Sequence, residues 1–257
     1  MKNDRDIIGR RALLRGATLG GSALILSGCD ALNESDTFRS ALRAAEALNQ
    51  TVHRSLMDRA ALAPEFAASD ISPIFKTNGS LTGTSAEYLA HVGNKFADWK
   101  LRIDGMVSNP MDVSLETLRA MPARTQITRH DCVEGWSAIA KWQGTPLRLL
   151  LQQAGLSARA KYIVFHCADS YGALPYYESI DLIDALHPQT ILAWGMNGET
   201  LPVKYGAPIR LRVERQLGYK HAKYVMRIEA TDDLTKFHGG KGGYWEDVGD
   251  YEWYAGI

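Results

Sequence analysis

The chain has 257 residues, of which 46% are hydrophobic and 23% charged, and its 29 Lys and Arg balance its 29 Asp and Glu. This length holds one large domain, or a domain of ordinary size with a small appendage. The composition is typical of a soluble globular protein, and the zero formal charge gives no indication of a nucleic-acid partner.

Residues 1–28 indicate an export signal. Arg10 and Arg11 resemble the pair of a twin-arginine signal, and the apolar run Ala17–Leu26 after them is shorter than the roughly 20 residues of a membrane-spanning helix. The run ends in a short motif, closing at Cys29, that resembles a bacterial lipobox. We therefore expect a periplasmic protein with a lipid on Cys29, held at the inner membrane by the aspartate that follows. An ordinary signal with an incidental cysteine is the alternative.

Residues 29–75 are expected to form a tether and a helix. Apolar residues from Phe38 to Val52 recur at helical spacing, and Ser35 or Asp36 can cap the start. We expect this amphipathic helix to pack on the domain that follows.

Residues 76–230 are expected to form the main domain, and the Gly- and aromatic-rich tail 231–257 to wrap its surface or cover its pocket. Alternation and apolar runs predict strands, and caps and proline stops predict short helices. Their irregular order indicates an α+β fold with a mixed sheet. The strands are expected at Trp99–Asp104, Thr125–Cys132, Tyr162–Cys167, Thr190–Trp194, Ile209–Val213 and Tyr224–Glu229, and the helices after Ser114, after Pro146 and over Ile180–Leu186, opened by Ser179.

The stretch Thr128–Ser137 carries the chemistry. Residues two apart share a face of a strand, so His130 and Cys132 should point the same way, and the turn at Glu134 and Gly135 should lift Cys132 to the end of the sheet. Arg129 and His130 beside an exposed cysteine would favour its thiolate. A thiolate serves either as a nucleophile or as a soft ligand for a transition metal.

Arg129, the run Cys132–Ser137 and the run Trp142–Leu147 resemble the core motif of the sulfite-oxidase superfamily of molybdopterin enzymes. The bacterial branch that includes the catalytic subunit of periplasmic methionine-sulfoxide reductase is closer. The resemblance extends from about Asn78 to Glu229. It implies a single molybdopterin-binding domain of sulfite-oxidase type.

The resemblance also implies a Mo-molybdopterin cofactor, with Cys132 as the protein ligand to molybdenum and Arg129 as a second catalytic residue. In this chain Tyr205 replaces the family's frequent Asn or His, and His221 stands where the reductase has a small residue, so these two assignments are weaker. By position in the motifs, the cofactor-binding residues would be Asn78, Cys132, Cys167, Tyr205, Arg210, His221, Ala222 and Lys223.

The residues alone leave other interpretations open. Arg210 and Arg212 share one face of a strand, which is also typical of a solvated face with Arg–Glu pairs. Cys167 could be a buried small residue, or could form a disulfide with Cys132 in an oxidising compartment. For His130, a hydrogen-bonding scaffold role is favoured over a role as ligand or base, because a lone histidine near a site is more often a scaffold residue.

The interpretation we favour is an exported molybdenum-dependent oxidoreductase that performs two-electron oxygen-atom transfer on a small, sulfur-containing substrate. The sequence has no covalent-haem, iron–sulfur or dinucleotide motif. The resemblance also ends without the β-sandwich domain through which sulfite oxidases dimerise. We therefore expect a monomer that exchanges electrons with a separate haem membrane protein or cytochrome. A cysteine hydrolase using Cys132 with His130 or His166, and a non-catalytic periplasmic binding lipoprotein, are the alternatives.

Overall fold

The structure is a computed structural model that describes residues 35–257, so the predicted export signal and lipobox lie outside the described residues. The chain divides into two compact units, Met1–Leu56 and Met57–Ile257. In the first unit, helix α2 spans Asp36–Leu56, and the backbone N–H of Phe38 donates to Ser35 Oγ at 3.4 Å. The predicted helix and its cap are therefore confirmed, whereas its packing on the second unit stays a prediction. Within residues 35–257, no helix is both long and apolar enough to cross a bilayer.

The second unit contains ten strands, five α-helices and four short 3₁₀ helices. The strands are β1 Lys100–Gly105, β2 Met111–Ser114, β3 Arg124–Asp131, β4 Ser137–Pro146, β5 Tyr162–Tyr171, β6 Leu174–Asp181, β7 Ile191–Met196, β8 Glu199–Thr200, β9 Arg210–Arg212 and β10 Val225–Thr231. The helices are α3 Ala86–Gly93, α4 Leu115–Ala120, α5 Leu147–Ala154, α6 Leu182–Ala185 and α7 Tyr244–Gly249, with 3₁₀ turns η1 Ala68–Asp70, η2 Val203–Tyr205, η3 Gly218–Lys220 and η4 Leu234–Lys236.

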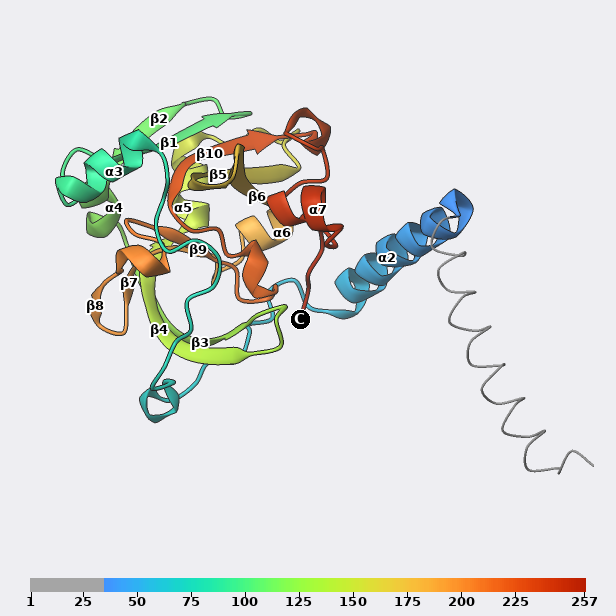
Figure 1. The fold of residues 1–257 in the computed structure, drawn as a ribbon, viewed down its shortest axis with the longest axis horizontal. Coiled ribbons are helices and arrows are strands. Elements are labelled where there is room, and N and C mark those ends of the chain that lie inside the picture. Colours follow the sequence, from blue (N-terminus) through green and yellow to red (C-terminus); the bar gives the residue numbers. More distant parts are fainter. Residues whose placement is uncertain (1–34) are drawn as a thin grey trace, which may run out of the picture. The chain divides into compact units, whose positions relative to one another are not determined.

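The strands form two sheets (Figure 1). One has the order β2-β1-β10-β5-β6, in which β1 and β10 are parallel and the other neighbours antiparallel. The second has the order β3-β4-β7-β8, and β9 pairs with the first half of β7. The mixed α+β class expected from the sequence is confirmed.

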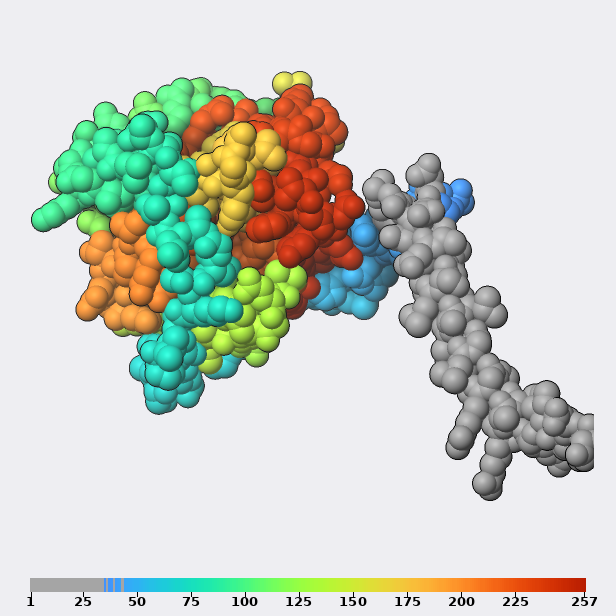
Figure 2. Space-filling model, in the orientation of Figure 1, coloured from blue at the N-terminus to red at the C-terminus, as the bar shows by residue number. Residues whose placement is uncertain are grey.

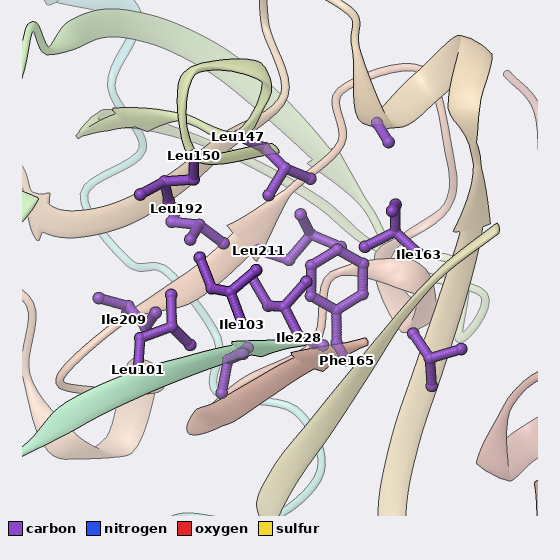
Figure 3. Close-up of a cluster of buried hydrophobic side chains, with 14 of the residues drawn as sticks. Leu101, Ile103, Leu147, Leu150, Ile163, Phe165, Leu192, Ile209, Leu211 and Ile228 are labelled. Atoms are coloured by element: carbon purple, nitrogen blue, oxygen red, sulfur yellow. The ribbon is translucent and has the colours of Figure 1, made fainter. Parts of the chain in front are cut away.

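The core lies where side chains of both sheets meet helix α5 (Figure 3). Fully buried apolar residues fill this region, and together they fix the two sheets against each other by removing apolar surface from water. Those labelled in Figure 3 come from β1, β5 and β10 of one sheet, from β7 and β9 of the other and from α5, with Ile209 just before β9: Leu101, Ile103, Leu147, Leu150, Ile163, Phe165, Leu192, Ile209, Leu211 and Ile228.

Local sequence signals account for several element ends. Ser114 Oγ accepts from the backbone N–H of Thr117 at the start of α4, as a capping serine does. Helix α5 ends at Gly155, whose φ of 69° lies in the left-handed region that favours glycine. Asn197 and Gly198 both have positive φ in the tight turn between β7 and β8. These three predictions are confirmed.

The helix predicted to start at Ser179 is wrong. Ser179 and Ile180 belong to strand β6, where they pair with Val164 and Ile163 of β5 and are fully buried. Helix α6 begins only after Asp181, whose side chain accepts from the backbone N–H of Asp184 at 2.9 Å. Burial of this segment inside the sheet overrides the capping signal of the serine.

Candidate active site

A solvent-open cleft with about 680 Å³ of space between its lining atoms lies at one end of the second unit. Its walls come from segments far apart in sequence: residues 78–79, the tip of the β3–β4 hairpin, residues 169–176, residues 210–223 and the C-terminal segment around 245–251. Figure 2 shows the teal, lime, gold and red parts of the chain meeting on this face.

The β3–β4 hairpin places Cys132 at the cleft. The backbone N–H of Cys132 donates to Trp136 O at 2.9 Å, and the N–H of Gly135 donates back to Cys132 O at 3.0 Å. Gly135 has a φ of 84°, which a residue with a side chain rarely adopts. The Glu134–Gly135 turn predicted from the sequence therefore closes the hairpin and brings Cys132 to the end of the sheet.

The environment of Cys132 differs from the expectation of an exposed thiolate beside cations. The residue is only 8% exposed, and burial raises the pKa of its thiol, although hydrogen bonds from the backbone of Glu134 and the side chain of Asn78 oppose that rise. Arg129 pairs with Asp131 at 2.8 Å instead, on a different cavity. Burial of Cys132 therefore opposes the thiolate expected from the sequence.

His130 does not have the role in thiol chemistry that was considered for it. Its ring is buried, Nδ1 lies 3.0 Å from Arg212 Nη1, and Nε2 packs so closely on Gly218 that an added Cβ there would come within 2.5 Å. Burial and the Arg212 charge hold the pKa of His130 well below its ordinary value. A neutral ring bonded to a guanidinium in this way is a scaffold residue, not a base for Cys132.

Two cations do line the cleft. Arg210 is 1% exposed, and its guanidinium donates to Tyr205 O at 3.1 Å and to His221 O at 3.3 Å, while Nε has no partner among the described residues. Burial and the charge of Arg212 lower the pKa of Arg210 to about 9. A side chain at Gly206 would crowd the Cβ atom of Arg210, so glycine there allows the backbone of residue 206 to lie close to Arg210.

Lys223 is the second cation. Its ammonium donates to Asn78 O at 2.8 Å and also to Ser80 O, which fastens the 78–80 segment across the cleft. Burial and the nearby Arg210 lower the pKa of Lys223 to about 8. Neither Arg210 nor Lys223 forms an ion pair with a carboxylate among the described ion pairs of residues 35–257, so both charges remain available to an anion.

Arg212 shares the strand face of Arg210 but does not line the cleft. Its guanidinium Nε donates to Glu214 Oε1 at 2.9 Å, and its guanidinium carbon Cζ lies 4.4 Å from the centre of the Trp142 ring. Both charged side chains are fully buried. The Arg–Glu pairing considered for this face therefore applies to Arg212 and not to Arg210.

The structure brings together only part of the predicted site. Asn78, Cys132, Arg210, His221 and Lys223 line one cleft. His221 Nε2 bonds Gln216 O at 3.0 Å, which leaves Nδ1 buried without a partner among the described residues.

The remaining predicted residues lie behind the cleft wall or away from it. The Tyr205 hydroxyl donates to Phe75 O at 2.8 Å, and the Ala222 carbonyl accepts from the backbone of Leu211. Cys167 is partly buried, and burial raises the pKa of its thiol well above the ordinary value. Cys132 and Cys167 are both free thiols, so the disulfide considered for them does not form.

Sequence reasoning missed Asp169. This carboxyl group is 3% exposed and lines the cleft. Its Oδ2 accepts from the Ser80 hydroxyl, whereas Oδ1 has no partner among residues 35–257. Burial raises its pKa to about 6. A polar residue at the end of the apolar strand β5 was the available signal, but alone it also fits an ordinary turn.

Comparison with known proteins now decides the family. The oxidoreductase molybdopterin-binding domain matches residues 89–238. A protein of Azospira oryzae, provisionally named protein-methionine-sulfoxide reductase subunit YedZ1, is 40% identical over 98% of this chain and 89% of its own length. The chain belongs to the molybdopterin-binding oxidoreductase family.

Two further relatives are more distant. The protein-methionine-sulfoxide reductase catalytic subunit MsrP of Xanthomonas campestris is 35% identical over 55% of this chain and 48% of its own length. The sulfane dehydrogenase SoxCD of Paracoccus pantotrophus aligns with a TM-score of 0.49 and 26% identity, over 53% of this chain and 39% of that one.

Membership of the family makes the protein a molybdenum-dependent oxidoreductase whose cofactor is Mo-molybdopterin. The hydrolase and the non-catalytic binding protein are therefore wrong. The lining of the cleft suits this cofactor. One thiol at the cleft suits a metal that brings its own sulfur ligands, and the two cations suit a phosphate.

Proposed function

We propose that five residues of the cleft hold molybdopterin, each with a different role. Cys132 supplies the thiolate that binds molybdenum, and Arg210 and Lys223 hold the phosphate of the pterin. Asp169 Oδ1 and His221 Nδ1, two buried cleft atoms without a partner among the described residues, would hydrogen-bond polar groups of the pterin. Their lack of protein partners supports this assignment, because buried polar atoms are normally hydrogen-bonded.

Asp169 extends the set of cofactor contacts beyond the motif residues. A carboxylate oxygen can accept hydrogen bonds from ring or amino N–H groups, which a pterin offers. The Ser80 hydroxyl already occupies Oδ2, so Oδ1 is the free acceptor. The neighbouring Lys223 also lowers the cost of an ionised Asp169.

The proposed reaction is the two-electron reduction of a methyl sulfoxide, such as methionine sulfoxide, to the thioether. The balance requires two electrons and two protons, and the sulfinyl oxygen leaves as water. The bound molybdenum supplies the centre at which oxygen-atom exchange and electron uptake occur. Two relatives named as protein-methionine-sulfoxide reductase subunits support this substrate and direction.

The chain's own residues act by placement and electrostatics. The hairpin turn holds Cys132 at the cleft with only 8% of its surface exposed, and the Asn78 side chain hydrogen-bonds its sulfur. Lys223 ties the 78–80 segment across the cleft, so the charged groups are fixed before substrate arrives. Such preorganised charge stabilises developing negative charge without rearrangement. Arg129, predicted as catalytic, would act only at a distance, since it is paired with Asp131 elsewhere.

Electrons are proposed to come from a separate redox partner, a haem membrane protein or cytochrome, to a monomeric enzyme in the periplasm. The word "subunit" in the names of two relatives supports a partner. The arginine pair Arg10–Arg11 and the lipobox-like Cys29 support export by the twin-arginine route and a lipid anchor.

The observation that carries the proposal is that Cys132 shares one cleft with Arg210 and Lys223 in a chain of this family. The test is to purify the protein from a molybdenum-replete host and to measure its molybdenum and pterin. Turnover of methionine sulfoxide is then measured with a reduced dye as electron donor. Protein with full cofactor that reduces no sulfoxide would refute the substrate, and protein without molybdenum would refute the cofactor roles.

A further inference from the structure

Aromatic rings from the C-terminal segment form one wall of the cleft. Trp245 and Tyr251 line it together with Tyr171, and all three are half-buried. The Trp245 and Tyr251 rings stack at 5.7 Å between centres, and Tyr171 lies 5.6 Å from Trp245. Tyr219 backs Tyr251 at 5.0 Å, edge to face. We call Tyr171, Trp245 and Tyr251 the aromatic wall.

The wall is held rigidly although it belongs to the end of the chain. Glu246, next to Trp245, accepts from the buried ammonium of Lys220 at 2.6 Å, and Lys220 also bonds the buried Glu178. The Tyr219 hydroxyl donates to Glu252 O at 2.6 Å on the other side of Tyr251. Trp245 is thus fixed by buried charge pairs, so its ring is a preformed surface.

The rest of the cleft lining is mostly polar. It includes Cys132, Arg210, Lys223 and Asp169, the groups that hold the cofactor in the proposed function. A substrate that enters the cofactor-filled cleft therefore meets both a polar reacting centre and aromatic faces. A methyl sulfoxide has this division, because its oxygen is polar while its sulfur and methyl group suit aromatic rings.

We propose that the aromatic wall selects substrates that carry a sulfur atom on an unbranched alkyl chain, by sulfur–aromatic contact with Trp245 and Tyr251. This inference rests on the proposed function for the position of the reacting oxygen. Trp245 and Tyr251 lie beyond residue 238, where the match to the family's domain ends, whereas Tyr171 lies inside it. Selection by this wall favours thioethers and sulfoxides over molecules of equal shape without sulfur.

The test measures binding of N-acetylmethionine amide, the product-like thioether, and of its norleucine analogue, in which a CH₂ replaces sulfur. Dissociation constants are determined by calorimetry on the holoenzyme and on Trp245→Leu, Trp245→Phe and Trp253→Leu, each with matched molybdenum content. Trp253 is the control: it belongs to the same segment, but its indole donates to Ser179 Oγ at 2.8 Å and its ring packs on Tyr162.

The holoenzyme and Trp253→Leu are expected to prefer the thioether. Sulfur–aromatic contacts predict that Trp245→Leu binds it roughly two- to ten-fold more weakly and loses the preference over norleucine, whereas Trp245→Phe keeps most of it. An unchanged preference in Trp245→Leu, or an equal loss in Trp253→Leu, overturns the inference. A holoenzyme that shows the preference but reduces no sulfoxide refutes the proposed function alone. A holoenzyme that reduces sulfoxides but does not prefer the thioether over its norleucine analogue refutes only the inference about the aromatic wall.

Discussion

Replacing Arg210 or Arg212 with methionine should separate cofactor binding from stability, although the two arginines share one strand face. Methionine keeps most of the side-chain volume, so each change removes mainly the charge and its hydrogen bonds. In the cofactor-free protein, Arg210 is a buried cation whose pKa falls from 12.5 to about 9. At about 1.4 kcal/mol per unit, its charged form costs on the order of 5 kcal/mol.

Arg210→Met removes that cost, but it also removes the two hydrogen bonds to Tyr205 O and His221 O. At roughly 1.5–3 kcal/mol for each charge-assisted bond, the two effects nearly cancel. The free energy of unfolding of the cofactor-free protein should therefore change little. The lost phosphate contact should lower cofactor affinity roughly ten- to a hundred-fold.

Arg212→Met should behave in the opposite way. It leaves Glu214 as a fully buried carboxylate without its partner, which costs about 3–5 kcal/mol of unfolding free energy. The assay is urea unfolding of both cofactor-free variants, with molybdenum and pterin content of the proteins as isolated. The reasoning is refuted if Arg212→Met keeps its stability but loses cofactor while Arg210→Met keeps cofactor.

Three further predictions concern other parts of the chain. Burial raises the pKa of the Asp169 carboxyl from 3.8 to about 6, so between these values the folded protein holds a proton that the unfolded chain has lost. The unfolding free energy of the cofactor-free protein should therefore fall by on the order of 3 kcal/mol as pH rises from about 4 to about 6 and level off above that, and Asp169→Asn should flatten this dependence in urea titrations from pH 4 to 7. Lys220→Met should lower the free energy of unfolding by about 3–5 kcal/mol, because Glu178 and Glu246 stay buried without their cation, and an unchanged unfolding midpoint would contradict the cluster's role. Replacing Arg10 and Arg11 with lysine should leave a cytoplasmic precursor on immunoblots, and labelled palmitate should mark mature protein only while Cys29 is present.

Local patterns predicted the elements that present the site. Alternation in β3 and a Gly135 turn were enough to place Cys132 at the end of a hairpin. The sequence did not predict which face of β3 is buried, because that face carries the polar residues Gln126, Thr128 and His130. Gln126 bonds Glu214 at 2.8 Å and His130 bonds Arg212 at 3.0 Å, and these partners, 88 and 82 residues away, leave no local signal.

Contacts between segments far apart in sequence also explain why some cleft residues could not be predicted from the sequence. Asp169 becomes a cleft residue only because Ser80 and Lys223 fold against it from opposite parts of the chain. Trp245 and Tyr251 follow no periodic pattern, and their position depends on the buried Lys220–Glu246 pair. Arg210 and Arg212 alternate identically in sequence, and only the folded structure distinguishes Arg212, which pairs with Glu214, from Arg210, which lines the cleft.

The most direct test of the account is the number of sulfur atoms around molybdenum, measured by X-ray absorption on purified wild-type protein and on Cys132→Ser. If Cys132 is the protein ligand, the variant should either lose its molybdenum or retain it with one sulfur neighbour fewer, because a hydroxyl is a harder and less acidic donor. A Cys132→Ser protein with wild-type molybdenum content and the same sulfur count would contradict the central claim.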